Sequence, residues 1–203
     1  MIAIRLNDLK QYSDVLLSRS GKPFTVRFVE PGDAEALQAY FRGLSVRSRY
    51  NRFFGAMSEL PAALLEHFTH PGEDDRFSII ALMQIDGVET IVGEARYEFN
   101  PATSRLEFGL SVDDRLQGQG IGQALLSNLE CRASAFGAET IFGETLRSND
   151  AMMAAARKAG YRFTQSPGDW KLVRFEKHID VAPAEIPCAS WRLAAEQAGR
   201  GAV

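Results

Sequence analysis

Three glycines occupy alternate positions in the sequence RLQGQGIGQALL, residues 115–126, directly before an apolar pattern typical of a helix. A glycine inside a helix costs about 1 kcal/mol relative to alanine, so this concentration at a helix start needs a reason. A helix N-terminus offers unpaired N–H groups and the positive end of a dipole, which together bind anions. We therefore expect Gly118, Gly120 and Gly122 to let the backbone approach a bound anion.

Two common phosphate-binding motifs do not fit this run. A Walker A loop needs Gly-x4-Gly-Lys-Ser/Thr, which the chain lacks. The dinucleotide fingerprint Gly-x-Gly-x-x-Gly/Ala fails, because its sixth position is Gln123 or Leu125, depending on the glycine that starts it. The run QGQGIG, residues 117–122, does match Gln/Arg-x-x-Gly-x-Gly/Ala, the pyrophosphate loop of the GCN5-related N-acetyltransferases (GNAT). From about Phe24 to Lys177 the chain resembles that superfamily, and a tight strand-to-helix turn without a ligand is the alternative interpretation.

The resemblance implies acetyl-CoA as co-substrate and no metal. It implies that the pantetheine arm binds the free backbone groups of Leu110, Ser111 and Val112, where their strand would diverge from its neighbour. Asn149, at the start of the following predicted helix, would contact the same arm. The pyrophosphate would lie on the backbone amides of Gln117, Gly118, Gln119, Gly120, Ile121 and Gly122.

Acetyl transfer to an amine also needs a general base, because a lysine ammonium must lose a proton before it attacks. In RLEFGLSV, residues 105–112, alternation places Glu107 on one face with Gly109 and Ser111. Glu107 also lies where protein acetyltransferases of this superfamily place their catalytic glutamate, so we predict that it is the base. Glu144 is the second choice and Glu98 the third, while a solvated residue paired with an arginine is the non-catalytic alternative for Glu107.

One position departs from the superfamily pattern. Many members carry a tyrosine in the helix after Asn149 that protonates the leaving thiolate. Aligning this sequence with theirs on Asn149 and Gly160-Tyr161 places Ala156 at the position of that tyrosine. The thiolate must then leave without that acid, or take its proton from water or another group.

The segment LSVRSRYNRFF, residues 44–54, resembles a segment of bacterial Pat-type protein lysine acetyltransferases, which regulate acyl-CoA synthetases. The acceptor implied by this resemblance is a protein lysine, such as one on an acyl-CoA synthetase. Arg47, Arg49 and Arg52 would form a basic rim that attracts an acidic partner, or else a solvated face. Two alternatives remain open: a small-molecule amine N-acetyltransferase, and a non-catalytic acyl-CoA-binding sensor.

The elements that position these residues follow from apolar periodicity. Strands linked by hairpins predict that one half of the sheet is antiparallel. The strand–helix–strand unit over residues 104–144 predicts one parallel pair of strands. We therefore expect an α/β fold of the GNAT type, with a mixed sheet of about seven strands flanked by helices. Predicted helices cover residues 8–17, 34–44, 45–54, 60–70, 122–136 and 151–160, the last of them capped by Ser148 or Asn149. Predicted strands cover residues 24–30, 76–85, 89–99, 104–112, 138–145, 161–165 and 169–177.

Composition bounds the remaining expectations. The chain has 203 residues and a net charge of −3, which gives no bulk attraction to nucleic acid. It has neither a membrane-spanning run nor a signal peptide, so the expected location is cytoplasmic, as a monomer or homodimer. Cys131 and Cys188 do not indicate a disulfide framework. We expect an N-terminal extension (1–22), an acetyltransferase domain (23–178) and a helical or partly disordered tail (179–203).

Overall fold

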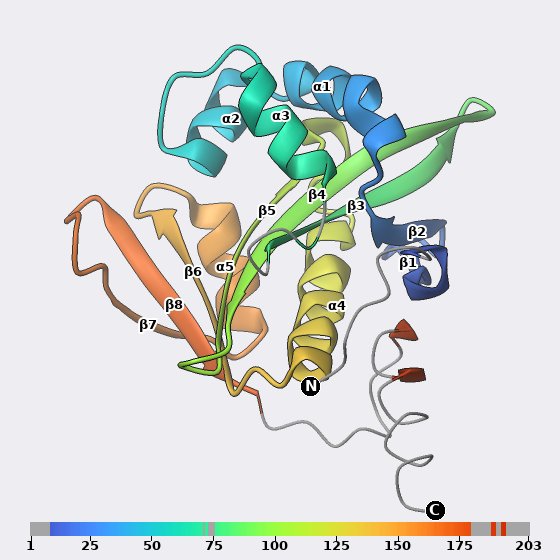
Figure 1. Cartoon of the computed structure of the whole chain (residues 1–203). Coiled ribbons are helices and arrows are strands. Elements are labelled where there is room, and N and C mark those ends of the chain that lie inside the picture. Colours follow the sequence, from blue (N-terminus) through green and yellow to red (C-terminus); the bar gives the residue numbers. More distant parts are fainter. Residues whose placement is uncertain (1–8, 71, 73–75, 180–187, 190–191, 194–203) are drawn as a thin grey trace, which may run out of the picture.

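A computed structural model describes residues 9–70, 72, 76–179, 188–189 and 192–193. Over these residues one mixed sheet runs in the order β1-β2-β3-β4-β5-β6-β8-β7 (Figure 1). Neighbouring strands are antiparallel except β5 and β6, which are parallel. This arrangement confirms the predicted α/β fold, with eight strands in place of about seven.

The elements lie close to their predicted positions, apart from the first. The strands are β1 (Asp14–Leu17), β2 (Pro23–Phe28), β3 (Arg76–Ile85), β4 (Val88–Asn100), β5 (Arg105–Val112), β6 (Thr140–Leu146), β7 (Arg162–Gln165) and β8 (Leu172–His178). The helices are α1 (Ala34–Gly43), α2 (Val46–Phe53), α3 (Ala62–Thr69), α4 (Ile121–Phe136) and α5 (Asp150–Lys158).

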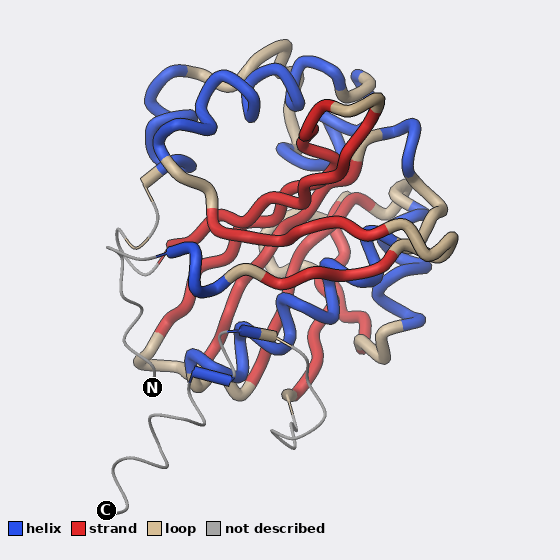
Figure 2. Tube along the Cα trace, turned by 90° about the vertical axis from the view of Figure 1, so that its right-hand side faces the viewer, coloured by secondary structure: helices blue, strands red, loops and turns tan. Residues whose placement is uncertain are grey.

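Helices cover both faces of the sheet (Figures 1 and 2). Alternate residues of β3 feed two cores: Ile79 and Ala81 pack in the core with α4, whereas Ile80 and Leu82 pack in the core with α1 and α3. A strand buried on both faces needs a continuous apolar run, which explains the sequence FSIIALM in the middle of the sheet. The sheet therefore separates an α1–α3 layer from an α4–α5 layer.

The predicted helix over residues 8–17 is wrong. The segment forms a short 3-10 turn (Leu9–Tyr12) and then β1, which pairs with β2. The buried carboxylate of Asp14 accepts hydrogen bonds from Asn128 Nδ2 at 2.9 Å and Arg132 Nη2 at 3.2 Å, both on α4. These partners lie more than a hundred residues away, so tertiary pairing overrides a local pattern that also fits a helix.

Cys131 and Cys188 form a disulfide, contrary to the sequence expectation. Cys131 lies on α4, and its Cα is 6.2 Å from that of Cys188, which returns to the same helix. The backbone N–H of Ala189 donates to Asp14 Oδ1 at 2.6 Å, so residues 188–189 contact both α4 and β1. The remaining predicted tail structure, like that of residues 1–8, lies outside the described residues.

Candidate active site

The glycine loop has the backbone geometry that its sequence predicts. Gly118 and Gly120 adopt left-handed φ angles of +76° and +89°, which favour glycine, and Gly120 is the N-cap of α4. The first amides of α4 have no acceptor within the helix, so they face the loop as free donors. Gln117 Nε2 donates to the Val112 carbonyl at 3.1 Å and closes the loop against the end of β5.

The turn between β1 and β2 also contacts this loop. Arg19 N donates to the Gln119 carbonyl at 2.7 Å, and a Cβ on Gly120 would lie 3.2 Å from that same nitrogen. The N-terminal segment thus helps to fix the shape of the glycine loop.

β5 and β6 diverge next to the loop. They pair only from Arg105 to Glu107 on β5 and from Thr140 to Phe142 on β6. On its other edge β5 stays paired with β4 as far as Val112. From Phe108 onward, one edge of β5 therefore has no strand partner within the described residues. Leu110, Ser111 and Val112 lie on this unpaired stretch, where an extended pantetheine arm can hydrogen-bond like a strand.

Asn149 lies across the divergence from β5, as the N-cap of α5. Its Nδ2 donates to Thr145 Oγ1 at 2.9 Å, and its Oδ1 accepts from Met152 N at 3.4 Å. The side chain is therefore fixed at the end of β6, on the rim of the same opening.

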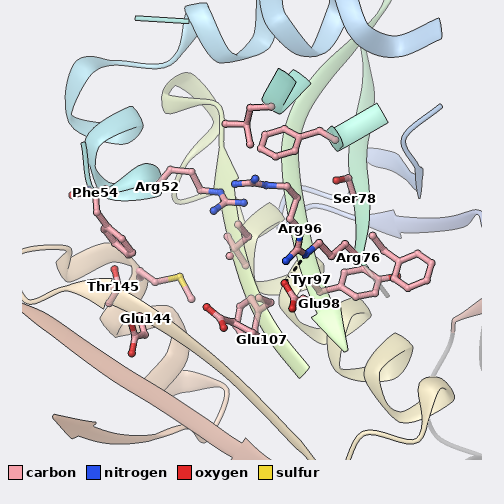
Figure 3. A pocket seen from close by; sticks show the side chains of 18 of the residues that line it. Arg52, Phe54, Arg76, Ser78, Arg96, Tyr97, Glu98, Glu107, Glu144 and Thr145 are labelled. Carbon is pink, nitrogen blue, oxygen red and sulfur yellow. Dashed lines mark hydrogen bonds and ion pairs between the residues drawn. The ribbon is translucent and has the colours of Figure 1, made fainter. Parts of the chain in front are cut away.

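A pocket of about 430 Å³ lies between α2, α3 and the diverging strands (Figure 3). Glu107, Glu144, Leu110 and Asn149, four of the predicted site residues, line it together. The glycine loop does not line it, so the structure separates the predicted pyrophosphate site from the pocket. Its charged and polar lining consists of Asn51, Arg52, His67, Arg76, Ser78, Arg96, Glu98, Glu107, Glu144, Thr145 and Asn149.

Glu107 is the carboxylate in this pocket best suited to accept a proton. Burial raises its pKa above the usual glutamate value, and the neighbouring charges of Glu144 and Glu98 raise it further. Within the described part of the chain its side chain has neither a hydrogen bond nor an ion pair. A carboxylate that is half-buried, unpaired and of raised pKa has the properties of a general base near neutral pH.

The other two candidate bases have partners. Glu144 Oε1 accepts hydrogen bonds from Ser166 Oγ and Arg174 Nη2, both at 2.9 Å. Glu98 pairs with Arg76 at 2.8 Å. Both carboxylates are thus engaged with other side chains, so the geometry keeps the sequence-based ranking of Glu107 first.

A buried polar network beside the pocket was not predicted. Glu94 Oε1 accepts from Arg52 Nε at 2.6 Å and from Ser111 Oγ at 3.1 Å, and Ser111 Oγ also bonds the Tyr40 hydroxyl at 3.0 Å. Burial alone would raise the pKa of Glu94, but the charges of Arg52 and Arg96 outweigh it and lower the pKa. The network connects α1, α2, β4 and β5, and places the Arg52 guanidinium over the middle of β5.

Gly109 makes room for that guanidinium. It lies between Glu107 and Ser111 on the pocket face of β5, and a Cβ there would lie only 2.5 Å from Arg52 Nη1. The sequence signal for this contact is the alternation of charged residues on β4. Glu94, Arg96 and Glu98 lie opposite Ser111, Gly109 and Glu107 of β5.

The predicted basic rim does not form as one surface. Arg52 points inward to Glu94, and Arg49 Nη1 donates to the Arg42 and Leu44 carbonyls, so of the three arginines only Arg47 is exposed. The reason is helical periodicity, since positions 47, 49 and 52 lie at different angles around α2. The two serines hold the start of α2 against Asp114. The Oγ atoms of Ser45 and Ser48 both donate to Asp114 Oδ1, at 2.9 and 2.7 Å.

Ala156, at the expected tyrosine position, is fully buried on α5. Its methyl group packs in the α4-side core and offers no proton to a leaving group. In the described residues there is no group of His, Cys, Asp and Glu arranged to hold a metal ion, and no helix among them is long and apolar enough to cross a membrane.

Residues 44–161 match the family model described as Acetyltransferase (GNAT) family, and this region spans more than half of the chain.

The chain belongs to the GNAT acetyltransferase family.

Individual relatives agree with this assignment. The GNAT chain is 25% identical over 149 residues to the Pseudomonas aeruginosa protein "Acetyltransferase PA5475", covering 73% of this chain and 80% of that one. It resembles the crystal structure of the GNAT domain of S. lividans PAT, with a TM-score of 0.74 and 28% identity over 82% of this chain and 96% of that domain. A cAMP-binding acyltransferase from Mycobacterium smegmatis shares the fold, with a TM-score of 0.59 and 21% identity over 91% of this chain and 55% of that protein.

The protein is therefore a GNAT-type enzyme, and the fold supports acetyl transfer from acetyl-CoA to an amine.

Proposed function

We propose that this GNAT enzyme transfers the acetyl group of acetyl-CoA to the side-chain amine of a lysine on a protein. The observation that carries the proposal is the place of residues 44–54, the segment that resembles Pat-type protein acetyltransferases. Val46–Phe53 of this segment form α2, and Asn51, Arg52 and the C-cap residue Phe54 line the pocket that contains Glu107. Tyr50 and Phe54 are 42% and 40% exposed, and so offer aromatic contacts to a partner surface.

In this proposal the backbone holds the co-substrate. The amides of residues 117–122 bind the pyrophosphate, and the free edge of Leu110, Ser111 and Val112 binds the pantetheine arm. Asn149 contacts the arm from the opposite side of the divergence. The thioester then lies beside Gly109 and Glu107, at the floor of the pocket.

The proposed chemistry starts at Glu107. Its carboxylate takes a proton from the lysine ammonium, directly or through a water, and the neutral nitrogen attacks the thioester carbonyl carbon. The carbonyl oxygen becomes an oxyanion, which backbone N–H groups on the free edge of β5 stabilise. The carbon–sulfur bond then breaks as the carbonyl forms again, and the nitrogen loses its second proton to water. The CoA thiolate takes up a proton from water, because Ala156 replaces the usual tyrosine.

A small-molecule amine is the second candidate acceptor. The pocket volume of about 430 Å³ falls within the range of small-ligand sites, and its walls carry both acidic and basic groups. A small acceptor would use the same Glu107 and the same co-substrate site.

One experiment separates the two acceptors. The purified enzyme is incubated with radiolabelled acetyl-CoA and either a bacterial protein extract containing acyl-CoA synthetases or a panel of small amines. We expect labelled lysines on a few proteins, with Glu107→Gln giving no label. Efficient labelling of a small amine, with no protein labelled, would replace the protein-lysine proposal with the small-molecule one.

The sequence-based boundaries of 23–178 for the catalytic domain, and the cytoplasmic location, remain part of this proposal. So does the expectation that the enzyme works as a monomer or homodimer.

A further inference from the structure

Two arginines share one carboxylate at the inner wall of the pocket. Glu94 bonds Arg52 Nε at 2.6 Å, whereas Arg96 Nε lies 3.7 Å from the other Glu94 oxygen, too far for a hydrogen bond. Arg96 Nε is buried and has no hydrogen-bond partner in the described residues. Together the three groups carry one positive charge more than Glu94 can neutralise.

Aromatic packing fixes Arg96 rather than neutralising it. Its guanidinium carbon lies 3.6 Å from the ring centroid of Phe68 and 5.0 Å from that of Phe53. Burial and the charge of Arg52 lower the pKa of Arg96 to about 9, only partly offset by Glu94. Arg96 is thus a buried cation whose ion pair in the described residues, with Glu94, is shared with Arg52.

This cation faces the acceptor pocket. Arg52 and Arg96 both line it, and their guanidinium groups lie next to each other above β5 in Figure 3. The Arg96 side chain keeps 23% exposure, and it lines this pocket. The nearby pairs Arg76–Glu98 and Arg174–Glu144 are each balanced, so they cannot supply the missing negative charge.

The pocket therefore has two poles. Arg96 lies opposite Gly109 on β5, two residues beyond Glu107, a separation of about 7 Å along the strand. One pole is an unpaired carboxylate that accepts a proton from an amine, and the other is a fixed cation that shares its anionic partner in the described residues, Glu94, with Arg52.

We propose that Arg96, supported by Arg52, binds a carboxylate that the acceptor carries close to its target amine. A protein acceptor would supply it from an aspartate or glutamate beside the lysine, and a small acceptor from its own acid group. The inference rests on the proposed function for the first source and only on the GNAT reaction for the second. A planar guanidinium suits this role, because it can bind both oxygens of a carboxylate.

The test uses two matched pairs of acceptors with the full chain and acetyl-CoA. The first pair is a blocked peptide with one lysine next to Asp, and the same peptide with Asn. The second pair is 5-aminopentanoate and pentylamine. For at least one pair we expect the carboxylate member to have a kcat/KM about 10- to 100-fold higher, mainly through KM, since hydrogen bonds between charged groups are worth this much.

Variants then assign the preference to Arg96. Arg96→Gln should remove it while the KM for acetyl-CoA stays unchanged, and Arg96→Lys should keep part of it because the charge remains. Arg42→Gln is the matched control, since Arg42 is an exposed arginine on α1 paired with Glu59 outside the pocket. Thermal unfolding of each variant shows whether the substitution destabilises the fold. A merely structural effect would lower kcat/KM equally for both acceptors of a pair.

The outcomes separate this inference from the proposed function. Equal use of both members in each pair, or a preference that survives Arg96→Gln, would overturn the carboxylate site. Acetylation of both peptides alike, with no carboxylate preference between the small amines, would support a lysine acceptor while rejecting the site. A carboxylate preference between the small amines, with neither peptide acetylated, would support the site and reject the lysine acceptor, and turnover of none of the four would contradict both.

Discussion

The glycine loop and the acceptor pocket are built by opposite means. The loop comes from one continuous stretch, residues 117–122, and offers mainly backbone N–H groups at the start of α4. The pocket takes its charged side chains from α2, β3, β4, β5 and β6. The buried network beside it, from Tyr40 through Ser111 and Glu94 to Arg52, joins residues up to 71 positions apart.

This difference corresponds to two tasks, binding of the co-substrate and selection of the acceptor. Backbone amides recognise any pyrophosphate, so the loop needs only glycines at the right spacing. Side chains fixed by packing decide which acceptor fits and where its proton goes. Changes in one region should therefore alter co-substrate affinity, and changes in the other should alter the acceptor reaction.

The largest expected effect is at Glu107. Glu107→Gln keeps the shape of the side chain but cannot accept a proton, so kcat should fall by roughly 10²- to 10⁴-fold. Calorimetry should show an unchanged dissociation constant for acetyl-CoA. Wild-type kcat in this variant from pH 6 to 9 would rule out Glu107 and leave Glu144 as the base.

The complementary change is in the loop. Gly118→Asp places a carboxylate beside the proposed pyrophosphate site, and like-charge contacts cost several kcal/mol, so the dissociation constant of acetyl-CoA should rise about 100-fold or more. Gly137→Asp is the matched control, because Gly137 has a similar φ of +85° and a Cβ at either glycine would have no close neighbour within 4 Å. If both variants weaken binding equally, backbone strain and not the phosphate explains the loss.

The buried pair in the pocket should matter for stability. Arg52→Met leaves Glu94 with weaker partners, and both side chains are only 10% exposed, so the free energy of unfolding should fall by about 3 kcal/mol. Arg42→Met removes an exposed pair and should change it by less than about 0.5 kcal/mol. Urea unfolding measures both, and equal losses would show that the Arg52–Glu94 pair has no special role.

The smallest effect is on pH dependence. A general base at Glu107 must be deprotonated to act, so the proposal predicts that kcat/KM falls as the pH drops through the raised pKa of Glu107. Glu144→Gln removes the neighbouring charge with the larger effect and so lowers the pKa of Glu107. The acidic limb of the pH profile, where kcat/KM falls, should then move down by roughly 0.5–1 pH unit.

Glu98→Gln provides the comparison for this shift. Glu98 acts less strongly on Glu107 than Glu144 does, so the limb should move less. An acidic limb that stays in place or moves upward in Glu144→Gln would contradict the assignment.

The same contrast explains what the sequence could predict. The loop, α4 and the alternation that puts Glu107 beside Gly109 are local patterns, and the structure has them where they were expected. β1 was missed because Asp14 is held by α4 and by Ala189, and these contacts leave no local trace. The Cys131–Cys188 disulfide and the inward turn of Arg52 were missed for the same reason, since their partners lie 57 and 42 residues away.

The most direct test of the proposed co-substrate site is an NMR titration of the ¹⁵N-labelled chain with acetyl-CoA. The largest amide shifts should fall on residues 117–122 and on Leu110, Ser111 and Val112, with smaller ones in α1 and α3. The Gly118→Asp variant should lose the shifts of the loop. Largest shifts in α1–α3, with the glycine loop unaffected, would contradict the view that the backbone of this loop and of β5 holds the co-substrate.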